Sequence, residues 1–404
     1  MDVTAGASGF SPPKTLAFMQ QQLASLTRHS LQLPLVTVTG SAEPWVTIDG
    51  RRLLNLASNC SLSLSTHPLV RQAAKAAIDD HAAGTCTSRL LGGNPPIAEE
   101  LERRFAAFKG TEAALLFSSG YMANIGVIPA LVGPRDQILG DTLNHASTHD
   151  GIRLSGATYH PFRHNDMAHL QDLLAHAPPK ERKLVITESI FSMDGDQAPL
   201  GDVADLCRRY QAMLLVDEAH ATGCIGPGGR GLVAQLGLEQ EVTLAVNTLG
   251  KALGSHGAIV TASQLVIDYL RHFVRTFIFT TGLPPASLAA ALAALAFLED
   301  HPQVVDRLQR NATFLRDGLR ALGFDTLASE THIIPLRISD ANTTLQVAYA
   351  LTNAGVFAGP IRFPAVYRGT ARIRASVVVG HSQEDLGFAL SAFARVGRCF
   401  GLIA

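Results

Sequence analysis

The feature that most constrains the fold is a series of short apolar runs between residues 111 and 262. These runs alternate with stretches of helical spacing, such as 122–131, 169–175 and 203–210. Strands that are apolar at every position are typical of a parallel sheet, because helices cover both of its faces. The sequence therefore predicts an α/β fold with a mostly parallel sheet between helices. The predicted strands are 113–117, 137–139, 184–187, 213–216, 243–246 and 258–261.

Shorter elements flank this region on both sides. Before it, the pattern predicts a loose arm over 1–14, helices over 15–28, 68–81 and 96–109, and a small hairpin with strands 36–39 and 45–48. After it come long helices over 286–298 and 304–322, then strands near 333–337, 356–360 and 372–376 between helices near 344–353 and 384–396. We therefore predict three parts of the chain: 1–60 (arm and hairpin), 61–290 (large domain) and 291–404 (smaller α/β domain).

Composition excludes several classes of protein. The 404 residues carry a net charge of −1, so no basic surface for nucleic acid or an anionic membrane is expected. The longest apolar run, 286–298, is too short to cross a bilayer, and no signal peptide is expected. Five scattered cysteines without a CxxC motif predict buried free thiols, no metal site and a cytoplasmic protein.

Lysine usage gives the first chemical clue. Of six lysines, five lie in polar or helix-surface contexts, whereas Lys251 lies in the apolar, glycine-rich segment 245–254 after a predicted buried strand. Burial would lower the pKa of its ammonium group and make the amine nucleophilic. A lysine that extends from a surface turn into solvent is the equally weighted alternative.

Acidic and histidine side chains follow other predicted strands. The run 213–216 ends in Asp217-Glu218-Ala219-His220, which places a carboxylate and an imidazole at the edge of the sheet where ligands bind. The same four letters occur in nucleotide hydrolases, but the phosphate loop GxxxxGK[ST] that such enzymes need is absent. A structural cap for Asp217 and a structural histidine are the simpler alternatives.

A turn of small residues supplies an anion site. Ser118-Ser119-Gly120-Tyr121 lies between a predicted strand and a helix, where free backbone N–H groups can bind a phosphate. His145 follows another strand. One lysine, one strand-end acid and a phosphate turn together meet the needs of pyridoxal 5'-phosphate (PLP).

The sequences of these segments and their order along the chain resemble those of the α-oxoamine synthases, a family of PLP-dependent enzymes. Two of the matching stretches are Val216-Asp-Glu-Ala-His-Ala-Thr-Gly223 and Thr248-Leu-Gly-Lys-Ala-Leu-Gly254. The others are 117–124, 144–147, 163–166, 189–196, 277–281 and 369–374. The resemblance covers essentially the whole chain and implies fold type I, with a large PLP-binding domain, a smaller C-terminal domain and a homodimer whose sites lie at the subunit interface.

The resemblance also implies roles for individual residues. Lys251 would bind the cofactor and move the α-proton, Asp217 would pair with the pyridine nitrogen, and His145 would stack on the ring. His220 and Ser192 would contact the phenolic oxygen side. The phosphate would be held by Gly120, Tyr121 and Thr248, with Thr280 and Thr281 from the other subunit. The amino-acid substrate would meet Arg374, whose forked guanidinium suits a carboxylate, and Asn59.

The reaction so implied joins a small amino acid (alanine, glycine or serine) to an acyl-CoA or acyl-carrier-protein thioester, with loss of CO2, to give an α-aminoketone. The chain departs from its relatives on the acyl side, at Cys60 and Ser61, in 84–89, and at Ala98 and Ala365. We therefore expect an acyl donor other than a pimeloyl thioester, such as the fatty-acyl donor of an autoinducer-type synthase. Two alternatives are a PLP-dependent aldolase or lyase and a binding protein without activity.

Overall fold

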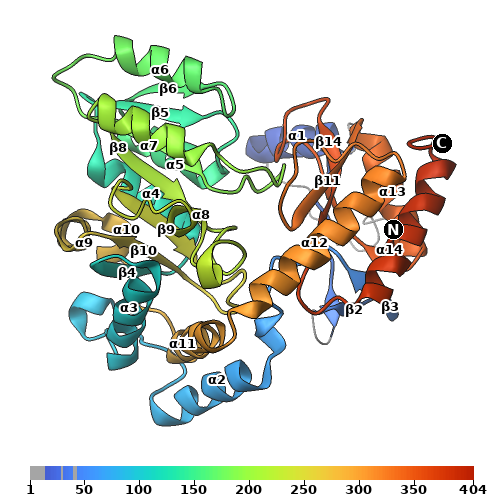
Figure 1. Cartoon of the computed structure of the whole chain (residues 1–404), viewed down its shortest axis with the longest axis horizontal. Helices are drawn as coiled ribbons and strands as arrows, with labels where there is room; N and C mark the ends of the chain where they lie inside the picture. Colours follow the sequence, from blue (N-terminus) through green and yellow to red (C-terminus); the bar gives the residue numbers. More distant parts are fainter. Residues whose placement is uncertain (1–13, 29–30, 40–42) are drawn as a thin grey trace.

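The computed structural model describes residues 14–28, 31–39 and 43–404 (Figure 1). Two groups of elements lie side by side in this part of the chain. The larger group surrounds a seven-stranded sheet, and the smaller group contains a three-stranded and a four-stranded sheet. The predicted arm over 1–14 lies almost entirely outside the described residues.

The seven-stranded sheet has the strand order β4-β10-β9-β8-β7-β5-β6. Its strands are β4 (Ala113–Phe117), β5 (Gln137–Asp141), β6 (Thr158–Phe162), β7 (Lys183–Glu188), β8 (Met213–Asp217), β9 (Leu244–Thr248) and β10 (Ala258–Ala262). β10 is antiparallel to both of its neighbours, and the other strands share one direction. The prediction of a mostly parallel sheet is confirmed, but it did not include β6.

Helices cover both faces of this sheet, which explains why its strands are apolar throughout. Leu115 packs on one face and Leu116 on the other, because successive side chains of a strand point in opposite directions. The first face is covered by α4 (Gly120–Leu131), α5 (Ala146–Ser155), α9 (Gln264–Phe273) and α10 (Arg275–Ile278). The second is covered by α3 (Pro96–Lys109), α6 (Met167–His176), α7 (Leu200–Arg209), α8 (Leu232–Gln235) and α11 (Pro285–Asp300). α2 (Pro68–Asp80) packs against α11.

The N-terminal hairpin belongs to the same sheet as a C-terminal strand. β1 (Val38–Thr39), β2 (Trp45–Ile48) and β3 (Arg51–Asn55) are antiparallel, and β3 pairs in parallel with β12 (Val356–Phe357). The three-stranded sheet consists of β11 (Ile333–Ser339), β14 (Ala371–Ser376) and β13 (Gly359–Ile361). Around these sheets lie α1 (Ala17–Arg28), α12 (Gln303–Ala321), α13 (Ala341–Asn353) and α14 (Gln383–Cys399) (Figure 1). The domain boundaries near 60 and 290 remain a prediction.

The thiols do not share one environment. Cys207 and Cys224 are buried, whereas Cys60 is half-buried and Cys86 and Cys399 are exposed. The prediction that all five are buried is therefore wrong for three of them. Within the described ranges, no single helix is long and apolar enough to cross a membrane. α11 and α12 meet that criterion only when they are taken together, and a bend of 86° separates them.

Candidate active site

The parallel strands bring several polar residues to one edge of the large sheet. Glu188 ends β7, Asp217 ends β8 and Thr248 ends β9. Glu188 and Asp217 are register partners on neighbouring strands, so their side chains leave the sheet together. Lys251 lies in the loop that follows β9. This edge, formed by the carboxyl ends of the strands, is where ligands bind in such sheets.

Lys251 contacts His220, which the sequence placed at the same edge of the sheet. Its Nζ atom lies 2.9 Å from Nε2 of His220, a residue that is 7% exposed. Burial lowers the pKa of Lys251, and the nearby carboxyl groups of Asp217 and Glu188 oppose this change. Burial and the neighbouring positive charge of Lys251 also hold the pKa of His220 well below its usual value. A neutral imidazole is therefore in contact with an amine that loses its proton more readily than usual.

Glycine determines the course of the lysine loop. Gly254 has a φ of +63°, and a Cβ atom on it would lie 2.3 Å from the backbone nitrogen of Ser65. The loop closes on itself through hydrogen bonds from Gly254 N to Lys251 O and from Ser255 N to Leu249 O, both 2.9 Å. These contacts hold Lys251 at the end of β9.

Asp217 is held from two sides. Its Oδ2 atom accepts a hydrogen bond from Nδ2 of Asn124 at 3.0 Å, and its Oδ1 atom accepts one from Ala219 N at 3.0 Å. Asn124 also donates to Oγ of Ser147 at 3.0 Å, and that oxygen lies 2.8 Å from Nδ1 of His145. These contacts join Asp217 to His145, an exposed residue at the start of α5.

Arg374 lies in a neutral, buried setting. It is 7% exposed on β14, and its Nε atom donates to the carbonyl oxygen of Ser192 at 2.7 Å. Its two terminal nitrogens donate to Oδ1 of Asn59, each at 3.1 Å. Burial lowers the pKa of Arg374 to about 10. No carboxylate of the described residues forms an ion pair with it, so the guanidinium retains capacity for an anion.

The phosphate turn lies beside β9. Ser119 caps α4 by accepting a hydrogen bond from Met122 N at 3.2 Å. A Cβ atom on Gly120 would lie 2.9 Å from Cγ2 of Thr248, so a larger residue at this helix N-terminus would press on the Thr248 side chain. The Tyr121 hydroxyl donates to the carboxylate of Asp150, so this side chain is directed to another partner.

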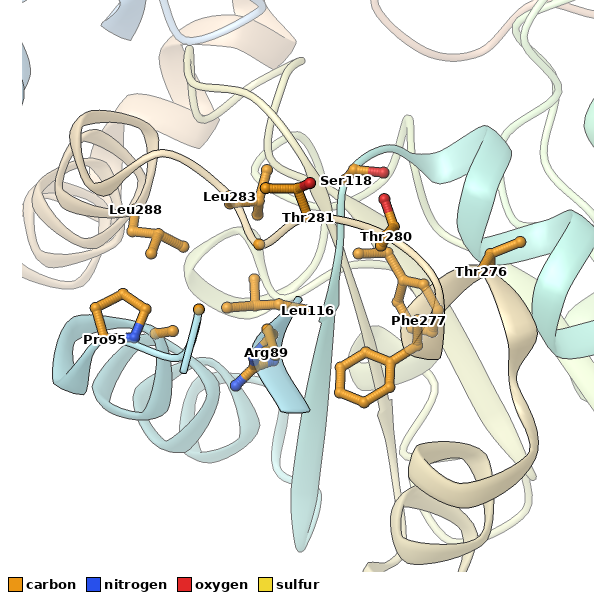
Figure 2. Close-up of a pocket in the computed structure, with 14 residues that line it drawn as sticks. Arg89, Pro95, Leu116, Ser118, Thr276, Phe277, Thr280, Thr281, Leu283 and Leu288 are labelled. Atoms are coloured by element: carbon orange, nitrogen blue, oxygen red, sulfur yellow. The ribbon is translucent and has the colours of Figure 1, made fainter. Parts of the chain in front are cut away.

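Thr280 and Thr281 lie beside Ser118, at the start of the small-residue turn. They line a pocket together with Ser118 (Figure 2). Thr281 also forms a β-bridge with Ser88. Within the described part of the chain, no hydrogen bond joins these two threonines to Lys251, Asp217 or Arg374.

Sequence reasoning missed three polar residues beneath the site. Asn124 lies within a matched stretch but received no role. Glu188 is 4% exposed, and the argument from strand ends that found Asp217 would also have found it. Lys109 was expected in a polar or surface context, which is wrong: it is 3% exposed, and its Nζ lies 2.6 Å from Oε2 of Glu218. No local pattern signals that pair, because 109 residues separate its members.

The residues present fit PLP. The buried Oδ1 atom of Asn124 and Oε1 atom of Glu188 have no hydrogen-bond partner among the described residues, so the site has polar capacity left for a ligand. The Gly120 turn provides room and N–H groups for a phosphate. Lys251 and Asp217 supply the amine and the carboxylate that this cofactor requires.

Comparison with known families agrees with this geometry. The model of the family described as aminotransferase class I and II matches residues 51–393. The chain belongs to this family. Within it, the chain is one of the PLP-dependent α-oxoamine synthases, which are acyltransferases. The fold expected from the resemblance is therefore confirmed.

Relatives and solved structures cover almost all of this α-oxoamine synthase. It is 44% identical to an 8-amino-7-oxononanoate synthase of Geobacter metallireducens over 385 residues, 95% of this chain and 98% of the relative. A serine palmitoyltransferase of Sphingomonas wittichii has a TM-score of 0.91 at 31% identity and covers 98% of this chain and 100% of its own. An 8-amino-7-oxononanoate synthase of Francisella tularensis has a TM-score of 0.75 at 28% identity and covers 86% of this chain and 98% of its own.

Proposed function

We propose that this enzyme condenses a small amino acid with an acyl thioester and releases CO2 and a free thiol. The product is an α-aminoketone. The observation that carries the proposal is the contact of Lys251 with His220 beside the fixed carboxylate of Asp217, at the edge of the sheet that also faces Arg374. Curated relatives of this family carry the name 8-amino-7-oxononanoate synthase, which supports the reaction class.

Each residue of the cluster has a physical task in this proposal. When bound, PLP supplies an electron-accepting ring that makes the α-carbon of the amino acid acidic. Lys251 takes the α-proton, because its lowered pKa leaves a larger share of the amine free to accept it. Asp217, whose two oxygens accept hydrogen bonds from Asn124 and Ala219, would pair with the ring nitrogen.

Substrate binding falls to the residues of the second group. Arg374 binds the amino-acid carboxylate, which supplies the anionic partner that its buried guanidinium lacks in this structure. Asn59, which now accepts from both terminal nitrogens of Arg374, keeps the guanidinium in place until the substrate arrives. Ser192 fixes the orientation of the same side chain through its carbonyl oxygen.

We further propose a cytoplasmic homodimer that takes its acyl group from CoA or an acyl carrier protein. The resemblance of residues 277–281 to the α-oxoamine synthases, which implies that Thr280 and Thr281 reach the phosphate of a partner subunit, supports the dimer.

The test is a matrix of alanine, glycine and serine against acyl-CoA thioesters, read by release of thiol and of CO2. We expect one thiol and one CO2 per turnover with at least one pair. Lys251→Ala should lower the rate at least about a thousandfold while leaving the melting temperature within a few degrees, because the change removes the proton-transferring amine alone. Thiol release that does not need an amino acid, or that occurs without CO2, would refute the proposal.

A further inference from the structure

The pocket beside the phosphate turn is apolar over most of its wall. Leu116, Leu283 and Leu288 are each at most 8% exposed, and Ala98 closes the wall at the start of α3. In Figure 2 the hydroxyl-bearing side chains of Ser118, Thr280 and Thr281 lie at one end, and Leu116, Pro95 and Arg89 lie toward the other. Ser118 is two residues from Gly120, so the polar end adjoins the proposed phosphate site.

Arg89 is the one charged residue among the described residues that line this pocket. Its charge is already neutralised. The guanidinium donates to both carboxylate oxygens of Glu102, at 2.9 Å for Oε2, and its Nε atom donates to Oδ1 of Asn94 at 2.8 Å. Both side chains of the pair are nearly buried, at 12% and 10% exposure. Glu102 is fixed in turn by Leu116 N, which donates to its Oε1 atom at 2.7 Å.

This arrangement distinguishes between two kinds of acyl chain. A hydrocarbon tail that ends in a methyl group can enter an apolar pocket without losing a hydrogen bond to water. A tail that ends in a carboxylate would lose its hydration and find no free cation, because Glu102 already neutralises Arg89. The product named for the curated relatives, 8-amino-7-oxononanoate, carries such a carboxylate.

We propose that this pocket receives the tail of the acyl group and selects thioesters that end in a methyl group over those that end in a carboxylate. The inference rests on the proposed function and adds the class of acyl donor. Ala98 sets the free space at the apolar end, and the Arg89–Glu102 pair keeps the wall without net charge.

Two thioesters of equal length test the selection: heptanoyl-CoA and pimeloyl-CoA. We expect kcat/KM to be at least about tenfold higher for heptanoyl-CoA, a size typical of discrimination in an apolar pocket. Acetyl-CoA, whose acyl group is too short to reach the apolar end, reports separately on the reaction. Equal or better use of pimeloyl-CoA would overturn the pocket inference and leave the proposed function intact. No turnover of any thioester, acetyl-CoA included, would instead refute the proposed function.

Ala98 offers a matched pair of variants. Ala98→Phe fills the apolar end, so the ratio of kcat/KM for heptanoyl-CoA over acetyl-CoA should fall about tenfold or more. Ala98→Ser adds one oxygen atom and should change this ratio less than twofold. Melting curves show whether each variant is folded. An unchanged ratio in folded Ala98→Phe would overturn the assignment of the tail to this pocket.

Glu102→Gln tests the charge argument independently of pocket volume. The amide oxygen can still accept from Leu116 N, but Arg89 loses its anionic partner. The ratio of kcat/KM for pimeloyl-CoA over heptanoyl-CoA should therefore rise several-fold. A folded variant with the wild-type ratio would show that the ion pair does not set the selection. Should this variant or Ala98→Phe fail to fold, the comparison of the two thioesters on the wild-type enzyme still decides the proposal.

Discussion

Glu188 places a second buried acid beside Asp217, and the two cannot both carry a charge at low cost. Its Oε2 atom accepts a hydrogen bond from Ser192 N at 3.2 Å, and Oε1 has no partner among the described residues. Burial and the nearby charge of Asp217 raise the pKa of Glu188 from 4.5 to about 8. The protonated form of this side chain is therefore favoured in the folded chain.

This pKa predicts how stability changes with pH. The protonated Glu188 side chain contributes fully to stability below the unfolded-state pKa of 4.5. This contribution is lost as pH rises through the folded-state pKa of about 8. Glu188→Gln removes the titrating group and keeps an acceptor for Ser192 N. Relative to wild type, the variant of the cofactor-free protein should gain at least about 1 kcal/mol between pH 5.5 and 8.5. Urea unfolding at both pH values measures this difference. Parallel stability curves for the two proteins would contradict the prediction.

At single residues, the sequence predicted what local context determines. Lys251 and Asp217 were identified because apolar runs precede them and the chemistry of PLP needs them. Lys109 could not be placed, because its burial depends on Glu218, on Thr222 at 3.3 Å and on the carbonyl oxygen of Arg230 at 2.5 Å. Those partners come from a distant segment, and helix spacing alone places Lys109 on a surface.

At the scale of elements, apolar runs predicted strands well where helices cover both faces. β6 was missed because it lies at the edge of the sheet, where Thr158, Tyr159, His160 and Pro161 are exposed or half-buried and no continuous apolar run exists. The sequence pattern also could not predict the direction of β10, because a buried antiparallel strand is as apolar as a buried parallel one. The pairing of β3 with β12 joins residues 302 positions apart, such as Leu54 and Val356, which local spacing cannot signal.

The lysine loop allows a test of backbone geometry with a matched control. Gly254→Ala places a Cβ atom against Ser65 N at a φ of +63°, so we expect a loss of at least about 1 kcal/mol in the free energy of unfolding and weaker PLP binding. At Gly250, where the nearest atom is Ser255 O at 3.4 Å, alanine should be tolerated. Urea unfolding and PLP titration distinguish the variants. Equal behaviour of the two variants would show that the loop does not depend on this contact.

At the scale of the whole molecule, one hydrophobic cluster crosses both groups of elements. It includes Leu54 of the hairpin, Leu116 of the large sheet, and Ile373 and Phe393 of the C-terminal elements. The single tryptophan, Trp45, lies in the hairpin and donates from Nε1 to Oδ1 of Asp385 at 3.1 Å. Its fluorescence therefore reports on the contact between the hairpin and α14.

A shared core predicts a single cooperative unfolding transition. Trp45 fluorescence and far-UV circular dichroism should give urea midpoints that agree within about 0.2 M. Both signals then report the same transition, whose steepness depends on the total surface that unfolding exposes. The loss of bound PLP should follow the same curve in the holoenzyme. A fluorescence change that precedes the loss of helix would mean that the hairpin and the C-terminal elements unfold before the large sheet.

The contacts that support the lysine loop also couple the evolution of two segments, 58–65 and the loop around Lys251. Gly254 lies against Ser65, and a Cβ atom on Gly223 would meet Ala252 at 2.7 Å and Leu62 at 3.3 Å. Segment 58–63, whose sequence we expect to differ from that of relatives, therefore runs directly into the residues that support Lys251. Substitutions in the two segments are in contact and should be epistatic rather than additive. Grafting a relative's 58–63 onto this chain would change the setting of its reactive amine, and a change of specificity would require both segments to be exchanged together.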